Sequence, residues 1–196
     1  PVEADELRRP APRGLLFYAR PEEHAARNLF DIGALALDEA LASGCFEGWE
    51  LSGVGTVEPD GGGLPLPRSG ASVELIARSA QADYARLLRS FDVGLALMYT
   101  PHPSLVPIEM CAAGMSTVTN TFENKDAPAL HRISSNIIAA PPTVDGVAAA
   151  LAEAEARSVS LVDRAAGSRI AWPTSWDEAL GPDVLAEVER LLGIRV

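Results

Sequence analysis

The chain has 196 residues, of which 47% are hydrophobic, and this is enough for one domain with a substantial core or one and a half. Its formal net charge of −11 argues against a nucleic acid partner, because neutralising phosphates requires a concentrated basic face. Lys125 is the only lysine, so contacts with phosphate would fall largely to arginine, whose guanidinium can bind phosphate bidentately.

The ends of the sequence and its cysteines set further limits. Residues 1–13 are charged and rich in proline, which predicts a linker and suggests a domain cut from a longer protein. Cys45 and Cys111 have no CxxC spacing and predict reduced thiols in a cytosolic protein. We expect no transmembrane segment, because no apolar run approaches the ~18 residues of a membrane span.

Strand and helix signals alternate along residues 14–196, which we expect to form the folded domain. Apolar runs bounded by turn residues predict six strands, at 15–19, 49–55, 73–77, 93–98, 116–120 and 136–140. Helical patterns occupy 25–42, 81–90, 107–114, 126–132 and 144–157, and residues 58–70, rich in glycine and proline, predict a surface loop. Six such units in a row predict an α/β fold with a doubly wound, Rossmann-like, six-stranded parallel sheet.

The segment 93–114 carries the most functional information. A buried strand is followed by a proline-rich loop and by a helix in which Pro107 suits the first position. The loop lies at the carboxyl end of the strand, where ligands bind in open α/β sheets. The first turn of the helix offers unpaired N–H groups to an anion such as a diphosphate, and Glu109 adds a carboxylate there.

Several common motifs are absent. The glycines Gly53 and Gly55 lack the third glycine of a dinucleotide fingerprint and follow the second strand, which argues against NAD. The sequence contains no GxxxxGK[ST], no GxSxG and no Asp-x-Asp pair, and its three histidines are scattered. We therefore expect a ligand that binds without a metal or a further cofactor.

Several runs together resemble the carboxyl-terminal domain of GT-B glycosyltransferases of the rhamnan-synthesis, bacterial rhamnosyltransferase type. The resemblance covers about residues 14–196 and rests on Phe17-Tyr-Ala-Arg-Pro-Glu22, Arg27-Asn-Leu-Phe30, the run from Tyr84 to Ser104, Glu109-Met110, Thr119-Asn-Thr-Phe122 and Asn124-Lys-Asp126. It implies one half of a GT-B fold, the half that binds a nucleotide-sugar. A separate amino-terminal domain would receive the glycan acceptor.

The resemblance also implies catalytic residues. Glu109 matches the second glutamate of the family's E-x7-E pattern, where a carboxylate accepts hydrogen bonds from the nucleoside sugar. The first glutamate of that pattern is replaced here by Pro101. Arg20 and Arg78 follow the first and third predicted strands, where they would stabilise the leaving nucleoside diphosphate. The plainer interpretation of both arginines is a surface ion pair.

Further contacts with the nucleotide-sugar are implied for Tyr99, His102, Ser104, Leu105 and Asn120. Tyr99 would stack on or hydrogen-bond to the nucleotide, and Ser104 with the neighbouring amides would hold the diphosphate. A histidine in an exposed loop, such as His102, is more often a bystander than a ligand, and Asn120 is equally readable as ordinary turn chemistry.

By this resemblance, the function is donor binding in a metal-independent, retaining glycosyltransferase that moves L-rhamnose from dTDP-L-rhamnose onto a glycan. This part of the enzyme alone would be inactive. We expect a cytoplasmic location, at the inner face of the membrane through the rest of the protein. Two alternatives remain open, namely half of a sugar-nucleotide epimerase and a non-catalytic module for nucleotide binding or scaffolding.

Overall fold

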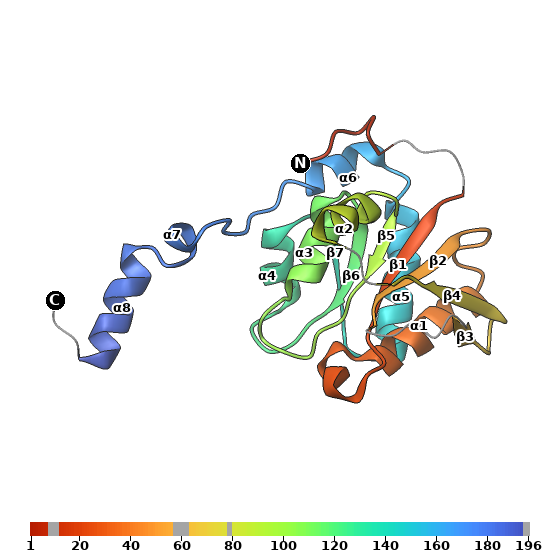
Figure 1. Cartoon of the computed structure of the whole chain (residues 1–196), viewed down its shortest axis with the longest axis horizontal. Coiled ribbons are helices and arrows are strands. Elements are labelled where there is room, and N and C mark those ends of the chain that lie inside the picture. Colours follow the sequence, from red (N-terminus) through yellow and green to blue (C-terminus); the bar gives the residue numbers. More distant parts are fainter. Residues whose placement is uncertain (8–11, 57–62, 78–79, 194–196) are drawn as a thin grey trace.

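The computed structural model describes residues 1–7, 12–56, 63–77 and 80–193. In this part of the chain a seven-stranded sheet lies between helices (Figure 1). The strands are β1 (Gly14–Ala19), β2 (Glu50–Gly55), β3 (Leu64–Leu66), β4 (Ala71–Leu75), β5 (Val93–Leu95), β6 (Ser116–Asn120) and β7 (Ile137–Ala140). Their order in the sheet is β3-β4-β2-β1-β5-β6-β7.

The six predicted strands are present, and they pair with one another in parallel. The predicted strand count was one too low, because β3 lies inside the predicted loop 58–70 and pairs antiparallel with β4. Leu66 is buried under this hairpin, and Gly70 turns the chain with a φ of 76°. Pro65 is tolerated because β3 is an edge strand. Within the described residues 63–70, the glycines and prolines that predicted a loop therefore belong to a short hairpin, whereas the rest of the predicted loop lies outside the described residues.

The helical elements are η1 (Glu23–Asn28, a 3-10 helix), α1 (Phe30–Ala42), α2 (Gln81–Leu88), α3 (Leu105–Ala112), α4 (Ala127–Ile133), α5 (Val144–Arg157), α6 (Leu161–Gly167), α7 (Trp176–Ala179) and α8 (Pro182–Leu192). Thr143 caps α5 by accepting a hydrogen bond from the N–H of Gly146. The last three helices were not predicted.

Two predicted helix starts were wrong. The helix expected over 25–42 is divided at Leu29, whose left-handed backbone (φ 49°) separates η1 from α1. This break lets Phe30 stack on the buried Phe17, with ring centroids 5.8 Å apart. Helix α3 begins at Leu105, so Pro107 is its third residue and not its first. Proline is still tolerated there, because the N–H at that position has no partner within the helix.

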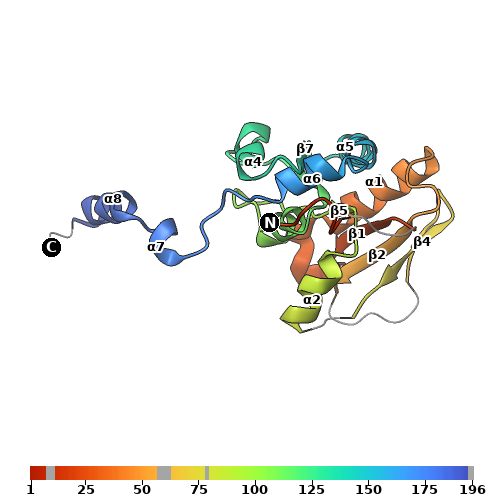
Figure 2. The ribbon, with the colours of Figure 1, turned by 90° about the horizontal axis from the view of Figure 1, so that it is seen from above.

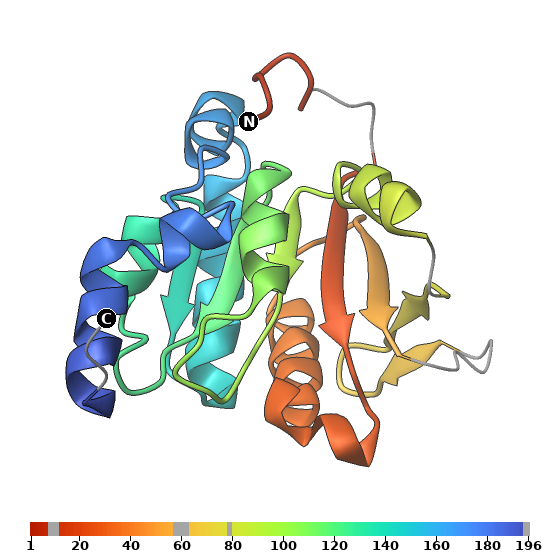
Figure 3. The same cartoon turned by 60° about the vertical axis from the view of Figure 1, so that its left-hand side comes forward.

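Alternating side chains of β1 divide the core into two layers. Leu15 and Phe17 face a cluster formed with α1 and α5, whereas Leu16 faces a cluster that includes Phe91 and Met110. Figure 2 shows α1 and α5 together on one side of the sheet and α2 on the other. In Figure 3 the arrowheads of the parallel strands point toward one edge, which is their carboxyl edge.

A buried ion pair closes the opposite, amino edge. The Arg164 side chain from α6 is 1% exposed, and its Nη1 lies 2.7 Å from Asp92 Oδ1. Arg164 Nε donates to the carbonyl of Gly114 at 2.7 Å, and Asp92 Oδ2 accepts the N–H of Gly14 at 3.1 Å. One guanidinium and one carboxylate thus connect α6 with the starts of β1 and β5 and with the turn after α3.

The two ends of the chain differ in packing. The expected linker begins with Val2 and Leu7 buried beside Gly114, and the N–H of Val2 donates to Ser168 Oγ at 3.0 Å. At the other end, α7 and α8 extend away from the sheet (Figures 1 and 2). Neither helix buries a residue, and Trp176 is 80% exposed.

Replacing Arg164 by alanine leaves the Asp92 carboxylate buried without its cation. We expect the Arg164→Ala variant to lose about 3–5 kcal/mol of unfolding free energy, measured by urea denaturation. Arg190→Ala is the matched control, because it removes an exposed arginine paired with Glu187 and should leave the free energy of unfolding nearly unchanged. Equal losses in the two variants would contradict a special role for the buried pair.

Candidate functional site

The carboxyl edge of the sheet has its switch point between β1 and β5. From β1 the chain proceeds to β2 and β4 on one side, whereas β6 and β7 extend the sheet beyond β5 on the other. Loops leaving neighbouring strands in opposite directions open a crevice at this point, which is where open α/β sheets bind ligands.

A cavity of about 280 Å³ opens at this edge. Its walls come from the ends of β1 and β2, from the segment after β4 and from helices α2 and α3. The lining residues are Tyr18, Val54, Gly55, Ile76, Ala77, Tyr84, Leu87, Val106 and Glu109. Most of this surface is apolar or aromatic, with a few polar groups, as is typical of a small-molecule site. We call it the α2–α3 pocket.

Glu109 supplies the only carboxylate among the described residues that line the α2–α3 pocket. It lies in the second turn of α3, and the hydroxyl of Tyr84 on α2 donates a hydrogen bond to it. Partial removal of water at the pocket wall raises the pKa of Glu109, and the Tyr84 hydrogen bond opposes this rise. Burial, reinforced by the nearby Glu109 charge, raises the pKa of Tyr84. Glu109 is thus a hydrogen-bond acceptor held toward the cavity.

Arg20 lies at the rim of the same pocket, directly after β1. Its Nε donates to Glu22 Oε2 at 2.9 Å, its Nη1 reaches the Tyr18 hydroxyl at 3.4 Å, and its Nη2 is 3.2 Å from His24 Nε2. Gly55 at the end of β2 has a φ of 109°, and a Cβ there would lie 2.9 Å from Arg20 Cδ and 2.6 Å from the Tyr18 ring. A glycine is therefore needed for this close approach.

The loop after β5 carries three of the predicted binding residues. The Tyr99 ring packs edge-on against Phe122 at 4.4 Å, and its N–H donates to the carbonyl of Arg27 at 2.7 Å. The N–H of Ser104 donates to His102 Nδ1 at 3.0 Å. Ser104 has φ 72° and ψ 152°, a conformation close to one that is essentially restricted to glycine. The local contacts hold this loop in a strained shape.

Two side chains hold the start of that loop, one from the last residue of β6 and one from the segment that follows β6. Asn120 is fully buried, and its Oδ1 accepts the Met98 N–H at 2.7 Å, while its Nδ2 donates to the carbonyls of Met98 and Thr121, each at 3.1 Å. Lys125 is 3% exposed, and its Nζ also donates to the Met98 carbonyl, at 2.5 Å. Desolvation lowers the pKa of Lys125 from 10.5 to about 8. Asn120 in this structure positions the loop, and a ligand contact by it stays a prediction.

Helix α3 starts where the strained loop ends. Ser104 precedes it without forming a side-chain cap, so the first-turn N–H groups at Leu105 and Val106 have no partner from that hydroxyl. The positive end of the helix dipole therefore lies between the α2–α3 pocket, which Val106 lines, and the side of the loop occupied by His102 and Leu105.

The structure thus brings together some of the predicted site residues. Glu109 lines the α2–α3 pocket, and Arg20 is adjacent to it through the contact of its Nη1 with the hydroxyl of the lining residue Tyr18. Tyr99 packs on Phe122 and His102 packs edge-on against Trp172 at 5.6 Å, and neither of them lines this pocket. Arg78 lies outside the described residues.

Sequence reasoning gave no role to Tyr18 or Tyr84, although both line the pocket. Each stands inside a run that carried the GT-B resemblance, and this was the available signal.

The described residues contain neither a metal-binding cluster nor a membrane-spanning helix. No group of three or more His, Cys, Asp or Glu side chains there is arranged to hold a metal ion. No described helix has the length and apolar character needed to cross a membrane. Cys45 and Cys111 form no disulfide.

The sequence of this chain is similar to a known family and to a known protein. Residues 13–152 match the family of the C-terminal domain of WsaF. The chain belongs to this family. Over 200 residues it is also 33% identical to the O-antigen biosynthesis protein RfbC of Myxococcus xanthus, in an alignment that covers 94% of this chain and 14% of RfbC. This WsaF C-terminal-type domain therefore spans only a small part of that relative.

Solved structures share its fold. The sucrose-phosphate synthase of Thermosynechococcus elongatus aligns with a TM-score of 0.59 and 17% identity, over 99% of this chain and 47% of the synthase. HepE of Anabaena, solved in complex with UDP and glucose, aligns with a TM-score of 0.55 and 14% identity, over 92% of this chain and 48% of HepE. The predicted fold, that of the carboxyl-terminal half of a GT-B glycosyltransferase, is confirmed, whereas rhamnosyl specificity stays a prediction.

The Tyr84 hydrogen bond predicts a measurable effect on Glu109. Because that bond opposes the rise caused by burial, Tyr84→Phe should raise the pKa of Glu109 further. Carbon-13 NMR of the Glu109 side-chain carboxyl across a pH series measures this pKa directly. Tyr99→Phe is the matched control, since Tyr99 packs on Phe122, and it should leave the pKa unchanged. A lower or unaltered Glu109 pKa in Tyr84→Phe would contradict the assignment.

The buried Lys125 predicts a pH dependence of stability. Its pKa is about 8 in the folded protein and near 10.5 in the unfolded chain, so the unfolded chain binds more protons between these values. Stability therefore rises with pH through this window. Between pH 7.5 and 10 we expect wild type to gain about 1 to 3 kcal/mol relative to Lys125→Met, measured by urea unfolding. Parallel pH curves for the two proteins would refute it.

Proposed function

We propose that this domain binds the nucleotide-sugar donor of a metal-independent glycosyltransferase, with the nucleoside in the α2–α3 pocket. The observation that carries the proposal is Glu109, a carboxylate that faces a pocket at the carboxyl ends of parallel strands. A carboxylate only accepts hydrogen bonds, so it suits the hydroxyl of a ribose or deoxyribose. The aromatic and apolar walls formed by Tyr18, Tyr84 and Ile76 suit the flat base.

The diphosphate would lie at the start of α3. First-turn amides after Ser104 and the positive end of the helix dipole favour an anion there. Arg20 at the pocket rim, and Arg78 by the family resemblance, would add positive charge. As the bond to the sugar breaks, negative charge grows on the leaving diphosphate, and these fixed groups would stabilise it. Metal independence is part of the proposal because side chains and amides would supply the positive charge.

For the donor we propose dTDP-L-rhamnose or a related nucleotide 6-deoxysugar, transferred with retention at the anomeric carbon. This rests on the family resemblance, and the RfbC similarity is consistent with synthesis of a surface polysaccharide. The acceptor would be a glycan presented by another domain. Structures such as HepE, of which this chain matches 48%, support a two-domain enzyme. This chain alone should bind the donor and transfer little.

Thermal unfolding of the 196-residue chain tests the proposal. Its arms contain dTDP-L-rhamnose, dTDP, a UDP-sugar or a GDP-sugar, each without metal and then with Mg²⁺. A ligand at 100 times its dissociation constant adds about 2.7 kcal/mol, which corresponds to roughly 5 to 10 °C here. We expect that shift with the dTDP ligands and no dependence on Mg²⁺. If only UDP or GDP ligands raise the unfolding temperature, the proposed pocket stands and the donor is a UDP-sugar or GDP-sugar instead.

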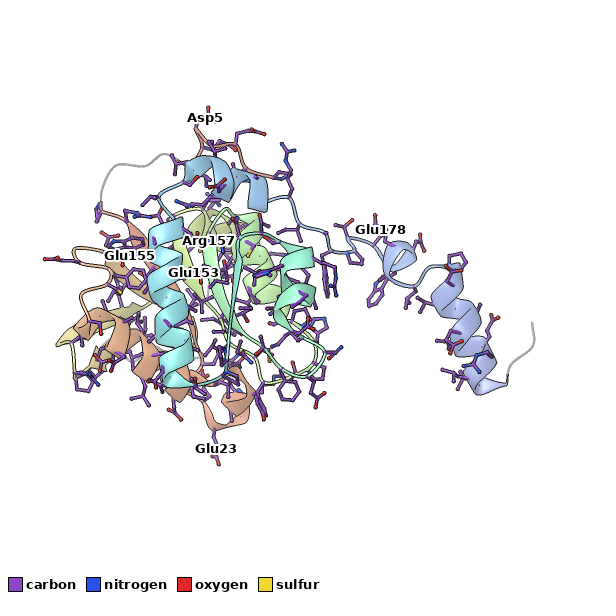
Figure 4. The ribbon with its side chains drawn as sticks, turned by 180° about the vertical axis from the view of Figure 1, so that it is seen from behind. Asp5, Glu23, Glu153, Glu155, Arg157 and Glu178 are labelled. Atoms are coloured by element: carbon purple, nitrogen blue, oxygen red, sulfur yellow. The ribbon has the colours of Figure 1, made fainter. Side chains whose placement is uncertain are left out.

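Matched glutamate variants locate the binding. Glu109→Ala should abolish the shift, whereas Glu153→Ala, on the face of α5 in Figure 4, should retain it. A shift that survives Glu109→Ala would contradict the pocket assignment. In the full-length protein, conversion of the donor without consumption of acceptor would instead indicate an epimerase, and unchanged sugar transfer in Glu109→Ala and Arg20→Ala would favour a scaffold.

A further inference from the structure

A second, larger cavity lies on the other side of the loop that follows β5. It has a volume of about 650 Å³, within the range of about 300 to 1,000 Å³ of ligand sites, and shares no lining residue with the α2–α3 pocket. Its walls come from the loop at Pro101 and His102, from α4 and the segment before it, and from the chain near Trp172. We call it the Trp172 groove.

The charge of the Trp172 groove is opposite to that of the chain. Lys125 and Arg132 line it beside His102, and no Asp or Glu is among its described lining residues, although the chain carries a net charge of −11. In the described part of the chain neither Lys125 nor Arg132 forms an ion pair. Lys125 Nζ has one protein acceptor, the Met98 carbonyl, and an ammonium has three donors. The groove is therefore suited to a negatively charged ligand.

The shape of the groove indicates what kind of anion. The Trp172 ring, held edge-on by His102 at 5.6 Å, also borders an adjoining cavity of about 400 Å³ that Leu105 and Trp176 line. A pyranose ring has a face of C–H groups that packs on an aromatic ring and hydroxyls around its rim that hydrogen-bond. Two adjoining cavities that share Trp172 in their walls thus fit consecutive sugars of a glycan.

The positive charge of the groove comes from separate side chains, which favours a carboxylate ligand over a phosphate ligand. Phosphate sites commonly use the free amides of a helix start. The start of α4, beside this groove, is already capped, because Asp126 Oδ1 accepts the Ala129 N–H at 2.7 Å. The uncapped start of α3 at Leu105 lines the adjoining cavity and not the groove itself. Separate side-chain cations remain. The guanidinium of Arg132 and the ammonium of Lys125 are side-chain cations that can each bind a carboxylate.

We infer that the Trp172 groove binds a glycan that contains a uronic acid, with the carboxylate at Lys125 and Arg132 and the next sugar beyond Trp172. Resting on the proposed function, this glycan would be the acceptor, and the groove would select an acidic one. The binding itself requires no donor, so it is measurable separately from the α2–α3 pocket.

Two disaccharides that differ in one carboxylate test the inference. Cellobiouronic acid and cellobiose are titrated into the ¹⁵N-labelled chain, and the indole N–H signal of Trp172 is followed by NMR. We expect cellobiouronic acid to shift that signal and to bind at least about tenfold more tightly than cellobiose, with the difference reduced by salt. Equal affinities, no shift at Trp172, or tighter binding of glucose 6-phosphate would overturn the inference.

Variants assign the charge. Lys125→Met and Arg132→Gln should each reduce the preference for the acid. The Arg132 side chain is exposed and forms no hydrogen bond with the described residues, so it can be replaced without loss of folding. Arg169→Gln removes an exposed cation outside the groove and should preserve the preference. A preference that survives Arg132→Gln and Lys125→Met would contradict the assignment.

Competition separates this inference from the proposed function. UDP or dTDP should not displace cellobiouronic acid, and displacement would show that the groove belongs to the donor site. Nucleotide binding without disaccharide binding would overturn this inference alone. Disaccharide binding without any nucleotide binding would overturn the proposed function alone.

Discussion

A buried carboxylate at the start of β5 organises the sheet. Asp92 accepts hydrogen bonds from the Gly14 N–H and from Arg164, so the first residues of β1 and β5 are fixed side by side at the amino edge. That adjacency is what makes β1 and β5 the pair at which strand order reverses. The crevice at the carboxyl edge therefore depends on an interaction at the opposite end of the same two strands, where no ligand is expected.

The loop after β5 divides the carboxyl edge into two regions of different chemistry. On one side, Glu109 and two tyrosines offer an acceptor and flat walls; on the other, Lys125 and Trp172 offer a cation and an aromatic face. The divider itself needs support, because Ser104 adopts a backbone conformation unfavourable to residues with a side chain. Hydrogen bonds that Met98 forms with Asn120 at the end of β6 and with Lys125 beyond it provide that support.

Much of the fold was predictable because the parallel strands are short apolar runs bounded by clear turn residues. The hairpin of β3 was missed because the strand is only three residues long and contains Pro65. The division of the helix at Leu29 was missed because a leucine rarely adopts a left-handed backbone conformation. For the site, Glu109 was predictable from its place in a helix after a strand. Tyr84 was given no role, because its role depends on which helices meet across the edge.

The hydrogen bond from the Tyr99 N–H to the Arg27 carbonyl joins two segments that leave β1 and β5 in opposite directions. Each segment borders the crevice, one carrying Arg20 and η1, the other leading to α3. Their main chains therefore form one continuous rim, and neither can be displaced without breaking this bond or moving the other. An opening of the crevice therefore either moves both sides of the rim together or breaks this hydrogen bond, so the Tyr99 amide distinguishes the two kinds of opening.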